Sequence, residues 1–97
     1  MSKPIRWTLP ALRQLEDIQD YIAEHNPRAA FELAERIRLQ VNEQLPEQPL
    51  SGRTGRVDGT RELVISGSKY IVAYRVKDDV EILAVKHGAQ IWPDTFE

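Results

Sequence analysis

Cysteine is absent from this chain of 97 residues. Without it, the chain forms no disulfide bond and carries no thiolate nucleophile. Only two histidines are present, His25 and His87, and they lie far apart in the sequence. A structural zinc site needs four ligands at short spacings, and this sequence does not supply them. We therefore predict a fold that needs no metal and no cofactor.

Long hydrophobic runs are also missing. No apolar segment approaches the roughly 20 residues that cross a bilayer. The N-terminal residues lack the apolar core of a secretion signal. These absences predict a cytoplasmic protein with no membrane partner. The length is that of one small domain, so we predict a single domain over residues 1–97.

A strong net charge of either sign is lacking too. The chain has 13 basic and 15 acidic residues, for a formal net charge of −2. This balance argues against nucleic-acid binding by bulk charge. The charges are nevertheless distributed unevenly, because six basic residues between Arg53 and Lys77 stand against two acidic ones. We therefore expect a local basic surface on a mildly acidic body.

The second half of the chain has the pattern of a three-stranded antiparallel meander. β-branched and aromatic residues fill three runs, and turn residues separate them. The predicted strands are Arg61–Ile65, Tyr70–Val76 and Val80–Lys86. Because side chains alternate between faces, Tyr70, Val72, Tyr74 and Val76 share one face of the middle strand. That face needs an apolar cover.

The first half predicts two amphipathic helices. Thr8 is a suitable N-cap for the first helix, whose apolar residues recur at helical spacing. Asn26 and Pro27 are a good N-cap and first residue for the second helix, which we expect to end near Leu45. The short link between the helices predicts an antiparallel αα-hairpin.

These elements predict an α+β fold. A short N-terminal strand over Ile5–Thr8 joins the sheet, and the helical hairpin packs on one face of a mainly antiparallel sheet. We expect residues 46–60 to form a surface loop, because they contain glycine and proline and no periodic apolar pattern. Of the C-terminal tail, Ile91, Trp92 and Phe96 are expected to fold back onto the body.

The order of these elements, together with four short motifs, carries a family resemblance. The motifs are Arg61–Leu63, Gly67–Tyr74, Val80–Val85 and His87–Gln90. The chain resembles the RelE/ParE superfamily of bacterial toxins from type II toxin–antitoxin modules. The resemblance implies one of two activities: mRNA cleavage in the ribosome, or inhibition of DNA gyrase without hydrolytic chemistry.

For the ribonuclease alternative, the resemblance implies roles for His87, Arg61, Arg56 and Tyr70. Metal-free RNA cleavage needs an acid–base pair, and cations for the charge that develops on the phosphate. The same residues also allow structural roles. His87 could be a half-buried histidine that hydrogen-bonds the tail, Arg56 an ordinary loop charge, and Arg61 the partner of Glu62 or of an acid on an antitoxin.

Several positions depart from the ribonuclease pattern and resemble the ParE branch better. Ile71 stands where similar ribonucleases carry an arginine, and Gln90 stands where an arginine often follows the histidine. We therefore favour a gyrase inhibitor that is no hydrolase. The predicted target-binding residues are Arg53, Arg56, Arg61, His87, Gln90 and Trp92. Trp92 is either an interface anchor or a lid over the sheet. A third alternative is a non-toxic module that only binds an antitoxin.

The resemblance implies a cognate ParD-like antitoxin in every case. We expect it to add a helix along the apolar side of the hairpin, and higher-order complexes are possible. DNA would be contacted only indirectly, through the antitoxin. The predicted antitoxin-binding residues are Leu12, Leu15, Ile18, Ile37 and Val41.

Overall fold

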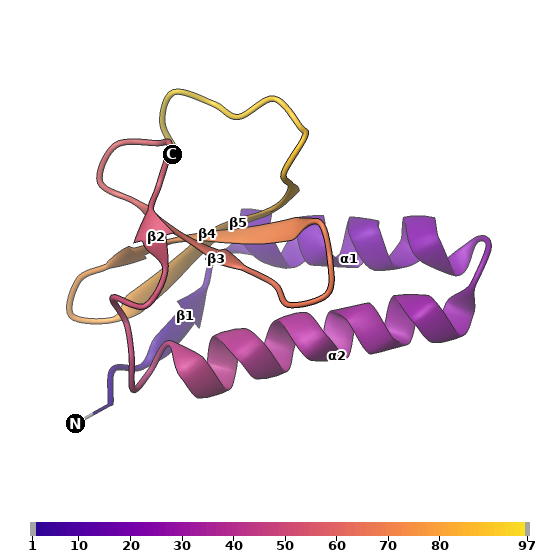
Figure 1. The fold of residues 1–97 in the computed structure, drawn as a ribbon, viewed down its shortest axis with the longest axis horizontal. Coiled ribbons are helices and arrows are strands. Elements are labelled where there is room, and N and C mark those ends of the chain that lie inside the picture. The colour runs from indigo at the N-terminus through magenta and orange to yellow at the C-terminus, as the bar shows by residue number, and fades with distance from the viewer. Residues whose placement is uncertain (1, 97) are drawn as a thin grey trace.

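A computed structural model describes residues 2–96 and contains two helices and a five-stranded sheet (Figure 1). The elements are β1 (Ile5–Trp7), α1 (Leu9–Ala23), α2 (Pro27–Gln44), β2 (Arg53–Thr54), β3 (Arg61–Val64), β4 (Tyr70–Val76) and β5 (Val80–His87). No helix in this described range is long and apolar enough to cross a membrane.

Both helices begin where local side-chain chemistry predicts. The Thr8 hydroxyl accepts a hydrogen bond from the Ala11 amide at 3.4 Å, and the Asn26 side chain accepts one from the Ala29 amide at 3.1 Å. Each cap satisfies an amide that has no partner inside its helix. The antiparallel hairpin that we predicted is confirmed.

The strand order in the sheet is β1-β5-β4-β3-β2, with β1 parallel to β5 and the other neighbours antiparallel. The predicted meander forms its centre. The expectation of an unstructured loop over residues 46–60 was wrong in part, because Arg53 and Thr54 pair with Glu62 and Arg61. Two residues are too few to show the alternation by which a strand is recognised in a sequence.

The two faces of the sheet have different covers. The helices lie against one face, with α2 below the strands and α1 behind them in Figure 1, and the tail arches over the other face. The main core lies between the helices and the sheet. It consists of Ala11, Leu15, Ala34, Ile37, Val41, Leu45, Leu63, Ile65, Val72, Tyr74, Val80, Ile82 and Val85. The predicted inward orientation of Val72 and Tyr74 is therefore confirmed.

An irregularity in β5 changes which residues face the helices. Ala73 pairs with Ala84, but the next residue, Tyr74, pairs with Ile82. Leu83 is therefore the extra residue of a β-bulge, and a bulge shifts the alternation of side chains along its strand. As a result His87 is brought to the helix-covered face, directly across from Tyr70.

Candidate functional site

Glu62 is the centre of an ion-pair cluster on the face of the sheet away from the helices. Its side chain is 2% exposed. Arg53 donates two hydrogen bonds to its Oε1, at 3.1 Å from Nε and 2.9 Å from Nη2. Arg56 donates its backbone amide to Oε2 at 2.8 Å and its Nε at 3.2 Å. Of the structural roles considered for Arg61, the pair with Glu62 is therefore not the one formed, because Arg53 and Arg56 neutralise this carboxylate.

Small residues follow Glu62 across the sheet. Ala73 on β4 pairs with Glu62, and Ala84 on β5 pairs with Ala73. Burial alone would raise the pKa of Glu62, but the hydrogen bonds from Arg56 and Arg53 outweigh it and the pKa is lowered. Glu62 is thus held as a carboxylate, with two arginines committed to it.

A second set of ion pairs crosses the same sheet. Glu81 accepts hydrogen bonds from Arg75, at 3.0 Å from Nε and 2.8 Å from Nη2, and pairs with Arg6. Arg6 also contacts Asp79 at 3.0 Å. The hydrogen bond from Arg75 is the largest cause of a lowered pKa at Glu81. Arg6 and Arg75 therefore also form ion pairs with acidic side chains.

Arg61 has a structural role at the start of β3. Its Nη1 donates to the carbonyls of Leu50 and Gly52, at 3.3 and 2.8 Å. Next to it, the Tyr74 hydroxyl donates to the Pro49 carbonyl at 2.8 Å and accepts from the Gly52 amide at 2.9 Å. Burial raises the pKa of Tyr74. Arg61 and Tyr74 together hold the loop that leads into β2.

The tail lies over the ion-pair cluster. The Arg56 guanidinium lies 4.2 Å from the ring centroid of Trp92, and its Nη1 reaches the Gly88 carbonyl at 3.4 Å. Trp92 also makes an edge-on contact with Phe96, with 6.4 Å between ring centroids. The predicted return of Trp92 and Phe96 to the body is confirmed. Ile91 differs, because 94% of it is exposed.

His87 lies on the other face of the sheet, in a shallow cleft of about 300 Å³ beside α1. Its ring centroid is 5.5 Å from that of Tyr70, in a T-shaped contact. Its Nδ1 accepts a hydrogen bond from the Ala89 amide at 3.1 Å, and the Gln90 side chain accepts one from the His87 amide at 2.6 Å. In the neutral ring the proton is therefore on Nε2.

The four residues named for RNA cleavage do not converge on one site. His87 and Tyr70 share the cleft next to α1. Arg61 pairs with Tyr74, four residues along β4 from Tyr70, or about 13 Å along the strand. Arg56 lies on the opposite face, between Glu62 and Trp92. Within residues 2–96 no three potential metal-ligating side chains are grouped together.

The predicted antitoxin-binding residues fall into two groups, which corrects the sequence interpretation. Leu15, Ile37 and Val41 are buried in the core, and Ile18 is partly buried against it, so they offer a partner little or no surface. Leu12 is exposed. A helical apolar stripe does not distinguish a core face from a binding face. The exposed apolar residues of the two helices are Leu9, Leu12, Tyr21, Phe31 and Leu39.

Residues 5–92 match the family described as the ParE toxin of the type II toxin–antitoxin system parDE. The chain belongs to the ParE toxin family. The predicted superfamily and the predicted α+β fold are thereby confirmed. A curated relative, the putative toxin Y4kP of Sinorhizobium fredii, is 50% identical to this ParE family member over 94 residues, which are 97% of each chain.

Among the less similar relatives of this ParE family member, some are named after RelE and others after ParE. Toxin RelE2 of Caulobacter vibrioides is 36% identical over 86 residues, covering 88% of this chain and 94% of the relative. A structure of the chromosomal ParDE system of P. aeruginosa matches with a TM-score of 0.82 at 26% identity, over 89% of this chain and 96% of that one. The RelBE2 toxin–antitoxin complex of Mycobacterium tuberculosis matches with a TM-score of 0.66, also at 26% identity, over 90% and 99%.

Proposed function

We propose that this chain is the toxin of a type II module, that it inhibits DNA gyrase, and that a cognate antitoxin neutralises it. Membership of the ParE family supports the toxin role. The observation that carries the choice of gyrase is the state of the basic residues. Arg53 and Arg56 are bound to the buried Glu62, and Arg61 is bound to backbone carbonyls.

Those contacts argue against RNA cleavage. A ribonuclease needs free cations near the scissile phosphate and near its acid or base. Here the arginine nearest to the His87 segment, Arg56, is neutralised by Glu62 and stacked on Trp92. The net charge of −2 adds no attraction for RNA, whose binding depends strongly on phosphate contacts.

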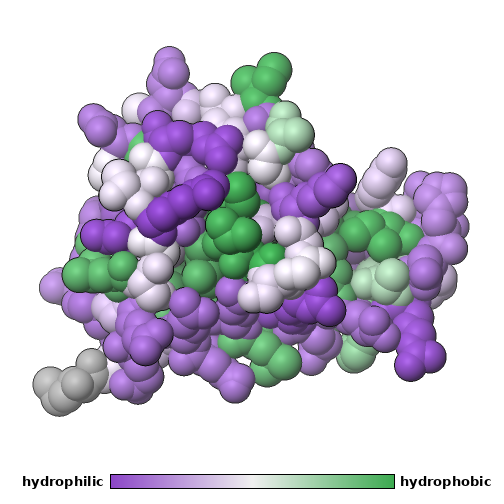
Figure 2. All heavy atoms as spheres, viewed as in Figure 1, coloured by the Kyte–Doolittle hydropathy of each residue, from purple (hydrophilic) through white to green (hydrophobic). Residues whose placement is uncertain are grey.

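The surface that we assign to gyrase is the exposed side of the cluster and the adjoining tail. Arg53 and Arg56 are about half exposed despite their bonds to Glu62, and Trp92 is half-buried beside them. Figure 2 shows hydrophilic side chains gathered over β2 and the neighbouring loop. Of the other predicted residues, Gln90 and His87 lie at the base of the tail, and Arg61 supports the loop.

The test is gyrase supercoiling of relaxed plasmid with purified toxin, beside a translation assay with ribosomes and mRNA. We expect loss of supercoiling or accumulation of cleaved DNA, with translation unchanged. Arg53→Ala should weaken gyrase inhibition, and Arg13→Ala on α1 is the matched control. Ribosome-dependent mRNA cleavage with normal supercoiling would reject the proposal. Activity in neither assay, with antitoxin binding intact, would support the non-toxic binding module.

One observation favours ribosome-dependent cleavage as a second candidate. His87 and Tyr70 line an open cleft together, and a 36% identical relative is named Toxin RelE2. His87→Gln separates the two functions. Under gyrase inhibition the variant should keep most of its toxicity. If toxicity is abolished while the fold and gyrase binding persist, the assignment to gyrase fails.

The antitoxin is proposed to bind the helical hairpin. Leu9 and Leu12, two of the exposed apolar residues of α1, offer a surface for an amphipathic helix, which would bury its own apolar stripe there. The matching structures from P. aeruginosa and M. tuberculosis bear titles that name a toxin–antitoxin system and a toxin–antitoxin complex. Co-purification with a co-expressed antitoxin, lost on Leu12→Asp and kept on Arg13→Asp, tests this proposal.

A further inference from the structure

The strands at the two edges of the sheet are shorter than the strands that they cover. β1 pairs only with Val80–Ile82 of β5, and β2 pairs only with Arg61 and Glu62 of β3. In the part of the chain that the structure describes, residues 83–87 and 63–66 have no strand beside them on that side. An open strand edge presents backbone amides and carbonyls to which another chain can add.

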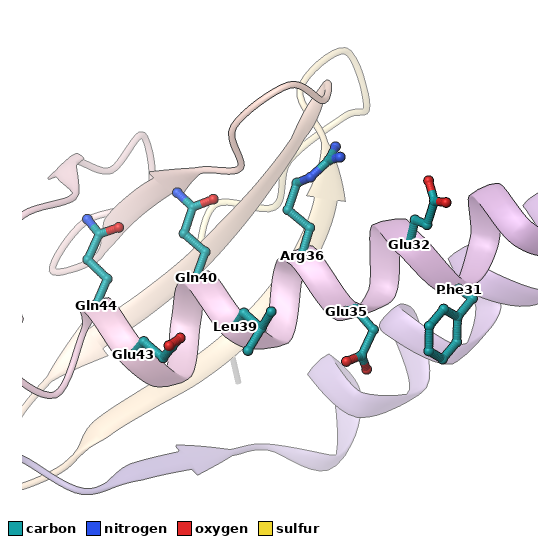
Figure 3. A pocket seen from close by; sticks show the side chains of 8 residues that line it. All are labelled: Phe31, Glu32, Glu35, Arg36, Leu39, Gln40, Glu43 and Gln44. Atoms are coloured by element: carbon teal, nitrogen blue, oxygen red, sulfur yellow. The ribbon is translucent and has the colours of Figure 1, made fainter.

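A glutamine from α2 occupies the open stretch beside β3. The Gln40 side chain donates from Nε2 to the Val64 carbonyl at 3.0 Å, and its Oε1 accepts from the Ser66 amide at 3.1 Å. One carboxamide therefore supplies a donor and an acceptor to the edge, as a residue on a neighbouring strand does. Figure 3 shows Gln44 extending from the same side of α2. Its Nε2 bonds the Ser51 hydroxyl at 2.9 Å instead.

Two further glutamines occupy the open stretch of β5. Oε1 of Gln14 accepts from the Val85 amide at 2.8 Å, and Oε1 of Gln90 accepts from the His87 amide at 2.6 Å. Backbone groups two residues apart lie on the same side of a strand, so both bonds are made along one edge. Gln14 comes from α1 and Gln90 from the tail, so glutamines from three separate segments bond to the two edges.

We propose that Gln14, Gln40 and Gln90 are edge guards, which keep the open strand edges from pairing with a second copy of this chain. Open space adjoins both edges. Gln40 and Val64 line a groove of about 390 Å³, and Gln14, Gln90 and Val85 line one of about 150 Å³. Val64 is 45% exposed, and an exposed apolar side chain on an open edge favours strand addition.

A second copy is the partner that the guards exclude, because every copy carries the same two edges. Two identical edges can pair antiparallel about a two-fold axis, in which each supplies the same amides and carbonyls to the other. A glutamine side chain blocks this pairing by already bonding those groups. The proposal concerns the sheet alone and is independent of the toxin's target.

Gln40→Met tests the guard beside β3, because methionine has a similar length but makes neither of the two hydrogen bonds. In sedimentation equilibrium we expect the original chain to remain monomeric and the variant to associate about tenfold more strongly, since two edge groups become open to a partner. Gln44→Met is the matched control. It makes the same change one turn further along α2, where the side chain bonds Ser51 and not the edge.

Amide hydrogen exchange locates the pairing. In dilute Gln40→Met, the Ser66 amide has lost its acceptor and should exchange about tenfold faster. At high protein concentration it should become protected again, because the strand of a second copy bonds it. Gln14→Met should give the same two results at Val85. Gln14→Glu keeps an acceptor for the Val85 amide and should leave its exchange unchanged.

Two results would overturn the proposal. The first is that Gln40→Met and Gln14→Met both stay monomeric although their edge amides exchange faster. The second is that Gln44→Met associates as strongly as Gln40→Met, because an added apolar side chain would then be the cause. Gln40→Ala adds no apolar length and should associate like Gln40→Met, with an unchanged circular dichroism spectrum. A monomeric Gln40→Ala beside an associating Gln40→Met would also reject the guard.

Discussion

The two faces of the sheet achieve burial by different means. On the helix-covered face, Val72, Tyr74 and Ile82 pack against two helices, and apolar contact dominates. On the other face, a thin cover of loop and tail lies over Glu62, two arginines and small alanines. The first face is stabilised mainly by surface removed from water. The second depends on charged hydrogen bonds whose geometry must be maintained.

The difference explains why the charged face is the better candidate for binding. Its two arginine side chains are about half exposed although they are bound to Glu62, and its cover is a tail that a partner could contact or displace. The helix-covered face is closed by the two helices. It is open only at its rim, where His87 and Tyr70 line a cleft. A toxin whose stability comes mainly from one apolar face can carry polar recognition residues on the other face without loss of core packing.

Truncating matched isoleucines on the two faces should give the largest effect. Ile82→Ala opens a cavity among residues of the main core, whereas Ile71→Ala removes a buried side chain outside that core, on the other face and near Gly88. We expect losses of unfolding free energy within about 2–5 kcal/mol, with Ile82 at the upper end and Ile71 at the lower. Urea unfolding measures both. Equal losses would show that the tail packs as firmly as the helices.

Removing the charge of Glu62 should have an intermediate effect. Glu62→Gln keeps the shape but loses charged hydrogen bonds from Arg53 and Arg56, and should cost about 1–3 kcal/mol at neutral pH. Asp58→Asn, at an exposed position in the loop before β3, should change stability by less than about 0.5 kcal/mol.

The same variant should change how stability depends on pH. The folded pKa of Glu62 lies below its ordinary value of 4.5, so its contribution is present above that value and is lost as the pH falls through the folded pKa. Unfolding should therefore become easier on acidification, and Glu62→Gln should show a shallower acid dependence. An unchanged acid dependence would mean that Glu62 is not held as the carboxylate by its arginines.

Weakening the contact between Arg56 and the tail should have the smallest effect. Arg56→Lys keeps the charge but loses the planar stack on Trp92, and should cost about 0.5–1 kcal/mol. Amide exchange in residues 88–96 should become faster. Arg53→Lys, which also pairs with Glu62 but has no ring contact with Trp92, is the control for the tail. Equal acceleration in both variants would assign the ordering of the tail to Glu62 and not to the stack.

Much of the fold could be predicted because its signals are local. Thr8 and Asn26 cap the helices through hydrogen bonds to residues three positions away. In the meander, apolar side chains recur at every second residue, which indicates strands. The family resemblance also rested on short motifs within those elements. By contrast, the β2 strand contains only two residues, and the bulge at Leu83 leaves no mark in the hydrophobic pattern.

The candidate site was harder to predict, because its contacts join distant segments. Arg53, Arg56 and Trp92 were named as one surface, and the structure does bring them around Glu62 and the tail. Glu62 itself was considered only as a partner for Arg61. Two arginines placed six and nine residues before an acid are a weak signal, and only the pairing of β2 with β3 makes it meaningful.

The sequence by itself determined the two helices, their caps, the central meander and the family, because each depends on residues that are neighbours along the chain. The tertiary structure decided which arginines are neutralised, which face His87 occupies and which apolar stripe remains exposed. Those outcomes depend on strand pairing, on one bulge and on the return of the tail. Such contacts form between distant segments only after the chain has folded.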